Sequence, residues 1–162
     1  MNIAIDFYNI FFIILLCGAA WCAWCISVAD WRRRIIPDAY LFPLLLIGLI
    51  IIAFFPWFTG IGDAVIAAVC GYALAAIIGY LFDITKTKNH KHSVVAPIGM
   101  GDIKLISVGG IWLGTFGLAL ALVIACVSGM LWGYIKHQKY IPLAPFFIGG
   151  GILSLIIIAF LL

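Results

Sequence analysis

The stretch FYNIFFIILLCGAAWCAWCISVADWRRR, residues 7–34, decides the fold of this chain. Its apolar part, from Phe7 to Ala29, exceeds the roughly 20 residues that a helix needs to cross about 30 Å of hydrocarbon. It lacks the alternation of a membrane barrel strand, and no basic segment precedes it as in a cleavable signal peptide. The run then ends at Asp30, Trp31 and three arginines. We therefore expect a membrane-spanning helix whose end lies at the membrane boundary.

The composition of the whole chain agrees with that stretch. Of its 162 residues, 67% are hydrophobic and 9% are charged, and glutamate is absent. A soluble domain carries about 25% charged residues, because its surface must be hydrated. The formal charge of +3 is small and serves membrane orientation rather than nucleic-acid binding. The sequence predicts an all-α, polytopic helical bundle in the lipid bilayer, with residues 1–162 forming a single domain and no nucleic-acid partner.

Further apolar runs follow the first. They cover about Ala39–Phe58, Ile61–Phe82 and Phe146–Leu162. A longer segment, residues 103–135, would form a helix of about 50 Å at about 1.5 Å per residue, too long for one span. It contains a natural break at residues 114–117, Gly-Thr-Phe-Gly. We expect a helical hairpin there, and hence about six spans.

The basic residues give the orientation. With the hairpin, all nine lysines and arginines fall in connections on one side, at residues 30–38, 83–102 and 136–145 or at the adjoining helix end. Basic connections stay in the cytoplasm by the positive-inside rule. Both termini are then expected outside, and residues 83–101 form the longest cytoplasmic loop.

The aspartates carry the functional information, since ionisable groups near membrane depth are costly. Asp30 ends the first span and Asp102 opens the fourth, so the predicted topology brings both to the cytoplasmic boundary. Two carboxylates in one site hold a single proton between them, as in an aspartic protease. Capping explains Asp63 at the third helix, and capping or favourable placement in the helix dipole explains Asp38 at the second. Asp83 ends the third helix, where negative charge opposes the helix dipole.

Asp102 belongs to Gly99-Met100-Gly101-Asp102, a GxGD motif followed by Lys104. Glycines there allow unusual backbone conformations and a close approach of substrate to the carboxylate. Lys104 either tunes Asp102 or extends to the interface. From the residues alone, a paired-aspartate hydrolase and a structural or transport role remain open.

No metal or cofactor is needed for this chemistry. Cys22 and Cys25 form a CxxC inside an apolar run without the second pair that a zinc site requires, and we interpret them as packing residues. His90 and His92 are interpreted as solvated loop residues.

Three stretches together resemble the signatures of type IV prepilin peptidases, membrane-embedded GxGD aspartic proteases of bacterial pilus and secretion systems. They are DWRRRIIPD at residues 30–38, GMGDIKL at 99–105 with GIWLG at 110–114, and IPLAPFF at 141–147. The order of these signatures and the six-helix plan agree with the family over essentially the whole chain.

The resemblance implies that Asp30 and Asp102 are the catalytic pair, with Pro37, Gly99, Gly101 and Lys104 as supporting motif residues. The implied substrate is a prepilin or pseudopilin, whose short basic leader is removed at the cytoplasmic face of the bacterial inner membrane.

Asp38 and Asp83 are then candidate contacts for the basic leader. Larger family members carry an extra N-terminal region and also methylate the new amino terminus. Nothing in this sequence corresponds to that region, so we expect peptidase activity without methylation.

Two competing functions are weighed against this one. In a non-enzymatic membrane protein the aspartates would bind a cation or relay protons, which requires polar groups reaching the far side. A presenilin-type protease places its first aspartate mid-membrane in a Tyr-Asp pair, which this sequence lacks.

Overall fold

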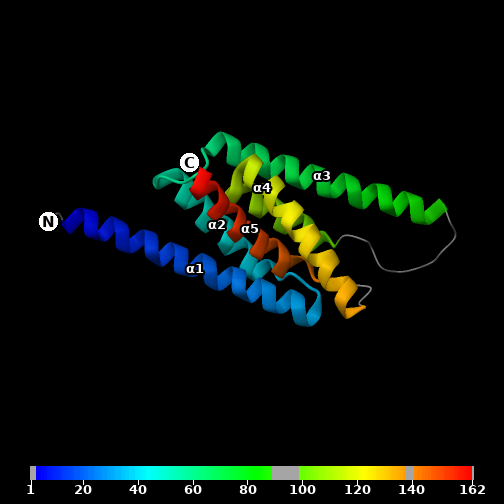
Figure 1. Cartoon of the computed structure of the whole chain (residues 1–162). Coiled ribbons are helices and arrows are strands. Elements are labelled where there is room, and N and C mark those ends of the chain that lie inside the picture. The colour runs from blue at the N-terminus through cyan, green and yellow to red at the C-terminus, as the bar shows by residue number, and fades with distance from the viewer. Residues whose placement is uncertain (1–2, 89–98, 138–140, 162) are drawn as a thin grey trace.

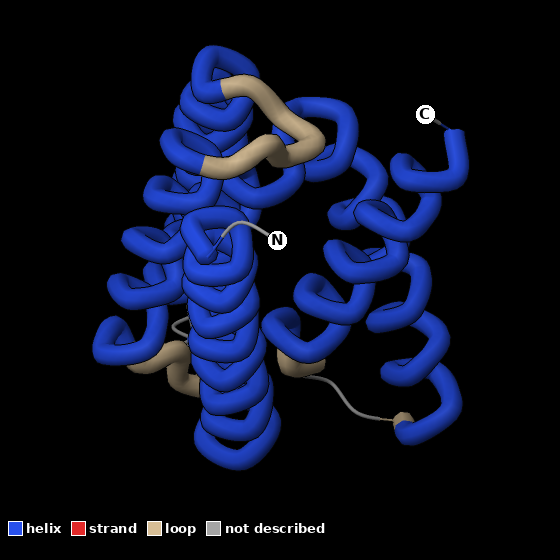
Figure 2. Tube along the Cα trace, turned by 90° about the vertical axis from the view of Figure 1, so that its left-hand side faces the viewer, coloured by secondary structure: helices blue, strands red, loops and turns tan. Residues whose placement is uncertain are grey.

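The computed structural model describes residues 3–88, 99–137 and 141–161, and these form helices and short connections (Figure 1). The helices are α1 (Ile3–Arg33), α2 (Asp38–Phe54), α3 (Ile61–Lys88), α4 (Met100–Lys136) and α5 (Leu143–Leu161). The described residues contain no strand (Figure 2). Four of the helices are long and apolar enough to cross a membrane, and α2 is a shorter apolar helix. The all-α membrane fold is thereby confirmed, and the chain is a multi-pass membrane protein.

Helix α4 folds back on itself at Gly114, whose backbone angles of φ 68° and ψ −175° are not helical. Just before this point, the carbonyl oxygen of Trp112 accepts a hydrogen bond of 2.8 Å from the Trp57 indole, in the α2–α3 connection. At the far end of α4, the Trp132 ring lies 5.3 Å from the Trp31 ring at the opposite end of the bundle. The two arms, residues 100–113 and 115–136, are therefore antiparallel (Figure 1). This confirms the predicted break.

Asp63 holds that reversal in place. Its two carboxylate oxygens accept hydrogen bonds from the Thr115 amide at 3.1 Å and from the Thr115 hydroxyl at 2.6 Å. The prediction that Asp63 caps α3 is wrong, because the helix already begins at Ile61 and the Asp63 side chain crosses to α4. Its place in the first turn still suits the helix dipole.

Several helix boundaries differ from those predicted. Helix α1 covers Ile3–Arg33 rather than Phe7–Ala29, and α5 begins at Leu143 rather than at Phe146. Helix α2 ends at Phe54 rather than Phe58, because Pro56 follows and the next residues turn toward α4, where Trp57 binds Trp112. Helix α3 continues beyond Phe82 to Lys88, although its candidate membrane span is the predicted Ile61–Phe82.

Helix α4 is the centre of the bundle. It packs on α2, α3 and α5, while α1 packs on α2 and α5. Close approach of α3 and α4 depends on Gly110, since a Cβ there would lie 2.6 Å from the Ala68 backbone nitrogen. Large apolar side chains such as Phe54 and Phe160 instead point outward, with exposures of 72% and 88%. In a bilayer these outward faces contact lipid.

Candidate active site

Asp30 lies in the last turn of α1 and is buried, with an exposure of 4%. Its Oδ2 accepts a hydrogen bond of 2.8 Å from the backbone amide of Ala144, the second residue of α5. The first amides of a helix have no partner within the helix, and the helix dipole favours negative charge there. The start of α5 thus supplies Asp30 with a donor that a buried carboxylate requires.

Arg34 provides the charge next to Asp30. It follows α1 in a left-handed conformation, with φ 55°, and its amide donates to the Asp30 carbonyl oxygen at 2.9 Å. The positive charge of its side chain acts on the Asp30 carboxylate. From the sequence, Arg34 is expected only to orient the chain, and its proximity to Asp30 is not predicted. A left-handed arginine at a helix end has no sequence signal of its own.

Asp102 is the third residue of α4 and is half-buried. Its Oδ2 accepts a hydrogen bond of 3.2 Å from the Gly99 amide. The negative charge of Asp30 acts on the Asp102 carboxylate. The two aspartates, 72 residues apart in the numbering, therefore meet at one end of the bundle and share an electrostatic environment, as the sequence analysis expected.

The two glycines of the GxGD motif have different roles from those predicted. Gly99 adopts φ −71° and ψ 148°, angles open to any residue, so the expected unusual backbone is wrong. Gly101 is required for close approach: a Cβ there would lie 2.9 Å from the Ile36 Cβ. The α1–α2 connection therefore presses directly on the turn that carries Asp102.

Pro37, Asp38 and Lys104 form a group beside the aspartates. Pro37 occupies the N-cap of α2 in an extended conformation without a side-chain cap, so Asp38 does not cap the helix as predicted. The Asp38 Oδ2 instead pairs with the Lys104 Nζ at 2.7 Å. Lys104, two residues after Asp102, therefore donates a hydrogen bond to the first residue of α2. Asp83 lies in α3, and its side chain is outside the described part of the structure.

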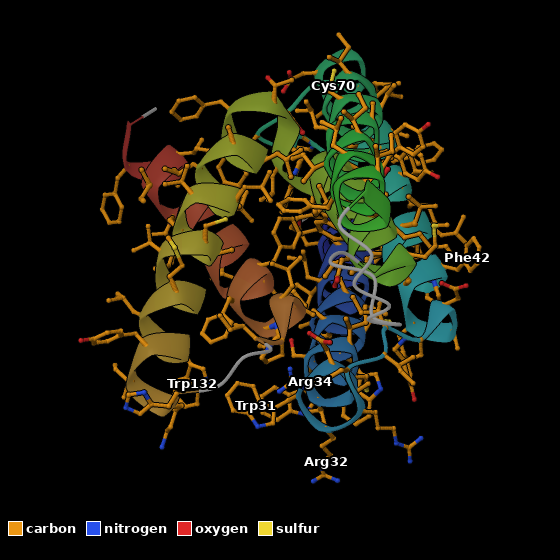
Figure 3. The ribbon with its side chains drawn as sticks, turned by 90° about the vertical axis from the view of Figure 1, so that its right-hand side faces the viewer. Trp31, Arg32, Arg34, Phe42, Cys70 and Trp132 are labelled. Atoms are coloured by element: carbon orange, nitrogen blue, oxygen red, sulfur yellow. The ribbon has the colours of Figure 1, made fainter. Side chains whose placement is uncertain are left out.

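Trp31, which follows Asp30 in the sequence of α1, forms an aromatic cluster with Trp132 of α4 and with Phe146 near the start of α5. The ring centroids of the cluster lie 5.3 to 6.5 Å apart. Figure 3 shows Trp31 and Trp132 near Arg34. An adjacent cleft of about 250 Å³ is lined by residues on either side of Asp30 in α1 and by one residue of α5: Ser27, Val28, Trp31, Arg32 and Pro145. The cleft therefore lies beside the turn of α1 that carries Asp30.

A second cavity of about 250 Å³ lies deeper, between α1, α2, α4 and α5. Apolar and small residues line it, among them Ala23 of α1, Leu44 of α2 and Phe147 of α5. Phe147 is three residues from Ala144, so this apolar space begins about one helical turn from the aspartates.

Within residues 3–88, 99–137 and 141–161, no group of three metal-ligating side chains is close enough to hold a metal ion. His90 and His92 lie outside the described residues. Cys22 is buried, Cys25 is partly buried, and both are free thiols.

The chain is similar to known proteins over most of its length. The profile of the type IV leader peptidase family matches residues 8–134, which include both aspartates. A prepilin leader peptidase/N-methyltransferase of Burkholderia pseudomallei is 30% identical over 136 residues, covering 80% of this chain and 41% of the relative. The protein of the same name from Pseudomonas putida is 32% identical over 120 residues, covering 74% of this chain and 39% of the relative.

The corresponding Stutzerimonas stutzeri protein is 30% identical over 143 residues, covering 84% of this chain and 47% of the relative. The chain therefore spans less than half the length of the curated relatives it matches. No solved structure gives a significant match. On the extent of the profile match, the chain belongs to the type IV leader peptidase family.

Proposed function

We propose that this chain is an aspartic endopeptidase that removes the basic leader peptide from type IV prepilins or prepilin-like proteins. The observation that carries the proposal is the shared site of Asp30 and Asp102. These carboxylates come from two different helices, α1 and α4. Family membership supports the proposal, because the profile match includes both residues.

The chemistry requires one ionised and one protonated carboxylate. The ionised group takes a proton from a water molecule as that water attacks the scissile carbonyl carbon. The protonated group donates its proton to the carbonyl oxygen, giving a neutral tetrahedral intermediate. The carboxyl group that took the water proton then gives it to the leaving nitrogen, while the other carboxylate takes a proton from a hydroxyl of the intermediate. The C–N bond breaks, the leader and the mature chain are released, and the pair returns to its starting protonation state. No metal or cofactor takes part.

We further propose that α1, α2, α3, both arms of α4, and α5 all cross the membrane, with both termini outside and the aspartates facing the cytoplasm. The basic residues support this orientation: Arg34 and Lys104 lie at the end of the bundle that carries Asp30, and Lys136 contacts the aromatic cluster there. Basic connections remain in the cytoplasm. The location would then be the bacterial inner membrane, with residues 1–162 acting as one domain.

This arrangement suits the proposed substrate. A basic leader stays in the cytoplasm beside the aspartates, while the apolar helix that follows it lies in the bilayer next to the enzyme. We propose Asp83 as a contact for the leader. We propose peptidase activity without methylation, since the paired carboxylates of Asp30 and Asp102 supply acid–base chemistry for hydrolysis rather than for methyl transfer.

The test is co-expression of a bacterial type IV prepilin with the wild type, Asp30→Asn and Asp102→Asn. Asparagine keeps the size and an acceptor oxygen but cannot ionise, so each variant should insert and lose leader removal. Asp63→Asn is the matched control, because Asp63 binds Thr115 at the opposite end of the bundle. We expect the Asp63→Asn variant to remove the leader as the wild type does.

Cleavage by either dyad variant would overturn the catalytic assignment. Mass spectrometry of the mature amino terminus tests the second part of the proposal. We expect the unmodified mass, and a gain of one methyl group would contradict it.

A further inference from the structure

The ion pair between Asp38 and Lys104 joins two helices next to the aspartates. Asp38 is the first residue of α2, and Lys104 is the fifth residue of α4. The Lys104 Nζ lies 2.7 Å from the Asp38 Oδ2, a distance typical of a charge-assisted hydrogen bond. Both side chains are half-exposed, at 39% for Lys104 and 48% for Asp38. A half-exposed ion pair contributes little to overall stability.

The location of the Asp38–Lys104 ion pair matters for the geometry of the site. Asp30 is fixed to α5 through the Ala144 amide, whereas Asp102 lies on α4 and its carboxylate receives a hydrogen bond from Gly99 in its own helical turn. Among the contacts that reach this turn from the α1–α2 region, two lie directly beside Asp102. One is the close contact of Gly101 with Ile36, and the other is the ion pair.

We propose that Asp38 and Lys104 are positioning residues that set the place of Asp102 relative to Asp30. The inference rests on the proposed function. Lys104 is two residues after Asp102 in the same helical turn, so its attachment to α2 limits how far that turn moves from α1. Catalysis depends steeply on such placement, since a displacement of about 1 Å reduces a rate by up to about 100-fold.

This role replaces the expectation that Asp38 contacts the basic leader. The Asp38 carboxylate already has a lysine partner within the protein. The two roles differ in kinetics: loss of a positioning residue lowers kcat, whereas loss of a leader contact raises KM.

The experiment uses the purified full chain in lipid vesicles with a type IV prepilin as substrate. The variants are Asp38→Asn, Lys104→Gln, their double mutant and Asp38→Glu. We expect each neutral single variant to lower kcat about tenfold and to change KM less than about twofold. The double mutant should be no slower than the slower single variant, because both remove the same contact. Asp38→Glu keeps the charge pair and should recover most of the activity.

A second readout needs no substrate. Hydrogen exchange of the peptide covering residues 100–110 should be faster in both neutral variants and equally fast in the double mutant. The matched control is Asp63→Asn, which should change exchange around Thr115 and leave residues 100–110 as in the wild type.

The outcomes separate the two proposals. A neutral variant whose kcat equals that of the wild type, with or without a raised KM, would overturn the positioning role. A double mutant whose kcat falls by the product of the two single effects would also overturn it. Unchanged exchange at residues 100–110 would also overturn it, whatever the activity. Coupled exchange effects in a chain that leaves the prepilin uncut would support the positioning contact and contradict the proposed function.

Discussion

Replacing Gly114 with alanine should destabilise the protein strongly, because two independent features of the structure exclude a side chain there. The backbone angles, φ 68° and ψ −175°, fall in a region that is essentially open to glycine alone, at a cost of about 1–3 kcal/mol for another residue. An added Cβ would also overlap the Asp63 carboxylate and lie 2.5 Å from the Thr59 Cγ2. Asp63 must then move away from Thr115.

That movement breaks the two hydrogen bonds from Thr115, each worth about 0.5–1.5 kcal/mol net. Together with the backbone cost, we expect Gly114→Ala to lower the free energy of unfolding by about 4 kcal/mol. Asp63→Ala removes only the hydrogen bonds and should cost about 2 kcal/mol. The measurement is reversible unfolding in mixed micelles, followed by circular dichroism.

Gly149→Ala is the control, since Gly149 lies in α5 with no atom within 4 Å of an added Cβ. Alanine is a better helix former than glycine, so this variant should gain about 0.5–1 kcal/mol. A Gly114→Ala protein within about 1 kcal/mol of the wild type would refute the reasoning, because an alanine tolerated at that position means that the chain does not reverse there.

Two further substitutions test the site and the core. Gly101→Ala places a Cβ 2.9 Å from the Ile36 Cβ and should slow prepilin cleavage about tenfold by displacing the Asp102 turn. Adding Ile36→Gly should restore the rate and adding Ile36→Val should not, because valine keeps the Cβ; equal rescue by both would contradict the contact. Ser154→Ala removes a hydrogen bond of 3.0 Å to the Gly117 carbonyl oxygen at a fully buried position. It should cost about 1 kcal/mol in the unfolding assay and leave cleavage by the folded protein unchanged, so a loss of cleavage would count against a purely structural role.

The features that the sequence predicted correctly rest on membrane physics. The break in α4 was predictable because residues 103–135 are too long for one span and contain glycines near their middle. The meeting of Asp30 and Asp102 followed from the helices between them, since α2 and α3 return the chain to the end of the bundle where α1 finishes. The reversal in α4 then returns the start of α5, with Ala144, to that same end. In such a chain few polar groups exist, so each one restricts the fold strongly.

The incorrect predictions concern side chains whose partners lie on other helices. Capping explained Asp63 and Asp38 from their neighbours in the sequence, whereas the structure pairs them with Thr115 and Lys104 across the bundle. Local sequence encodes helix starts well, but it contains no signal for a partner more than 50 residues away. The amide donor at Ala144 was equally hidden, since any residue except proline supplies a backbone N–H. Its only signal was the IPLAPFF stretch, residues 141–147.

Two of the described aspartates bind α4 at different ends of the bundle. Asp38 pairs with Lys104 near the start of the helix, and Asp63 binds Thr115 directly after the reversal. In a bilayer, apolar packing between helices is weakly directional, because lipid tails are as apolar as the side chains they replace. Hydrogen bonds to carboxylates fix register instead, since a shift of one helical turn, about 5.4 Å, would break both contacts at once. Asp38 thus fixes the part of α4 next to Asp102, and Asp63 fixes the reversal at the opposite end of the bundle.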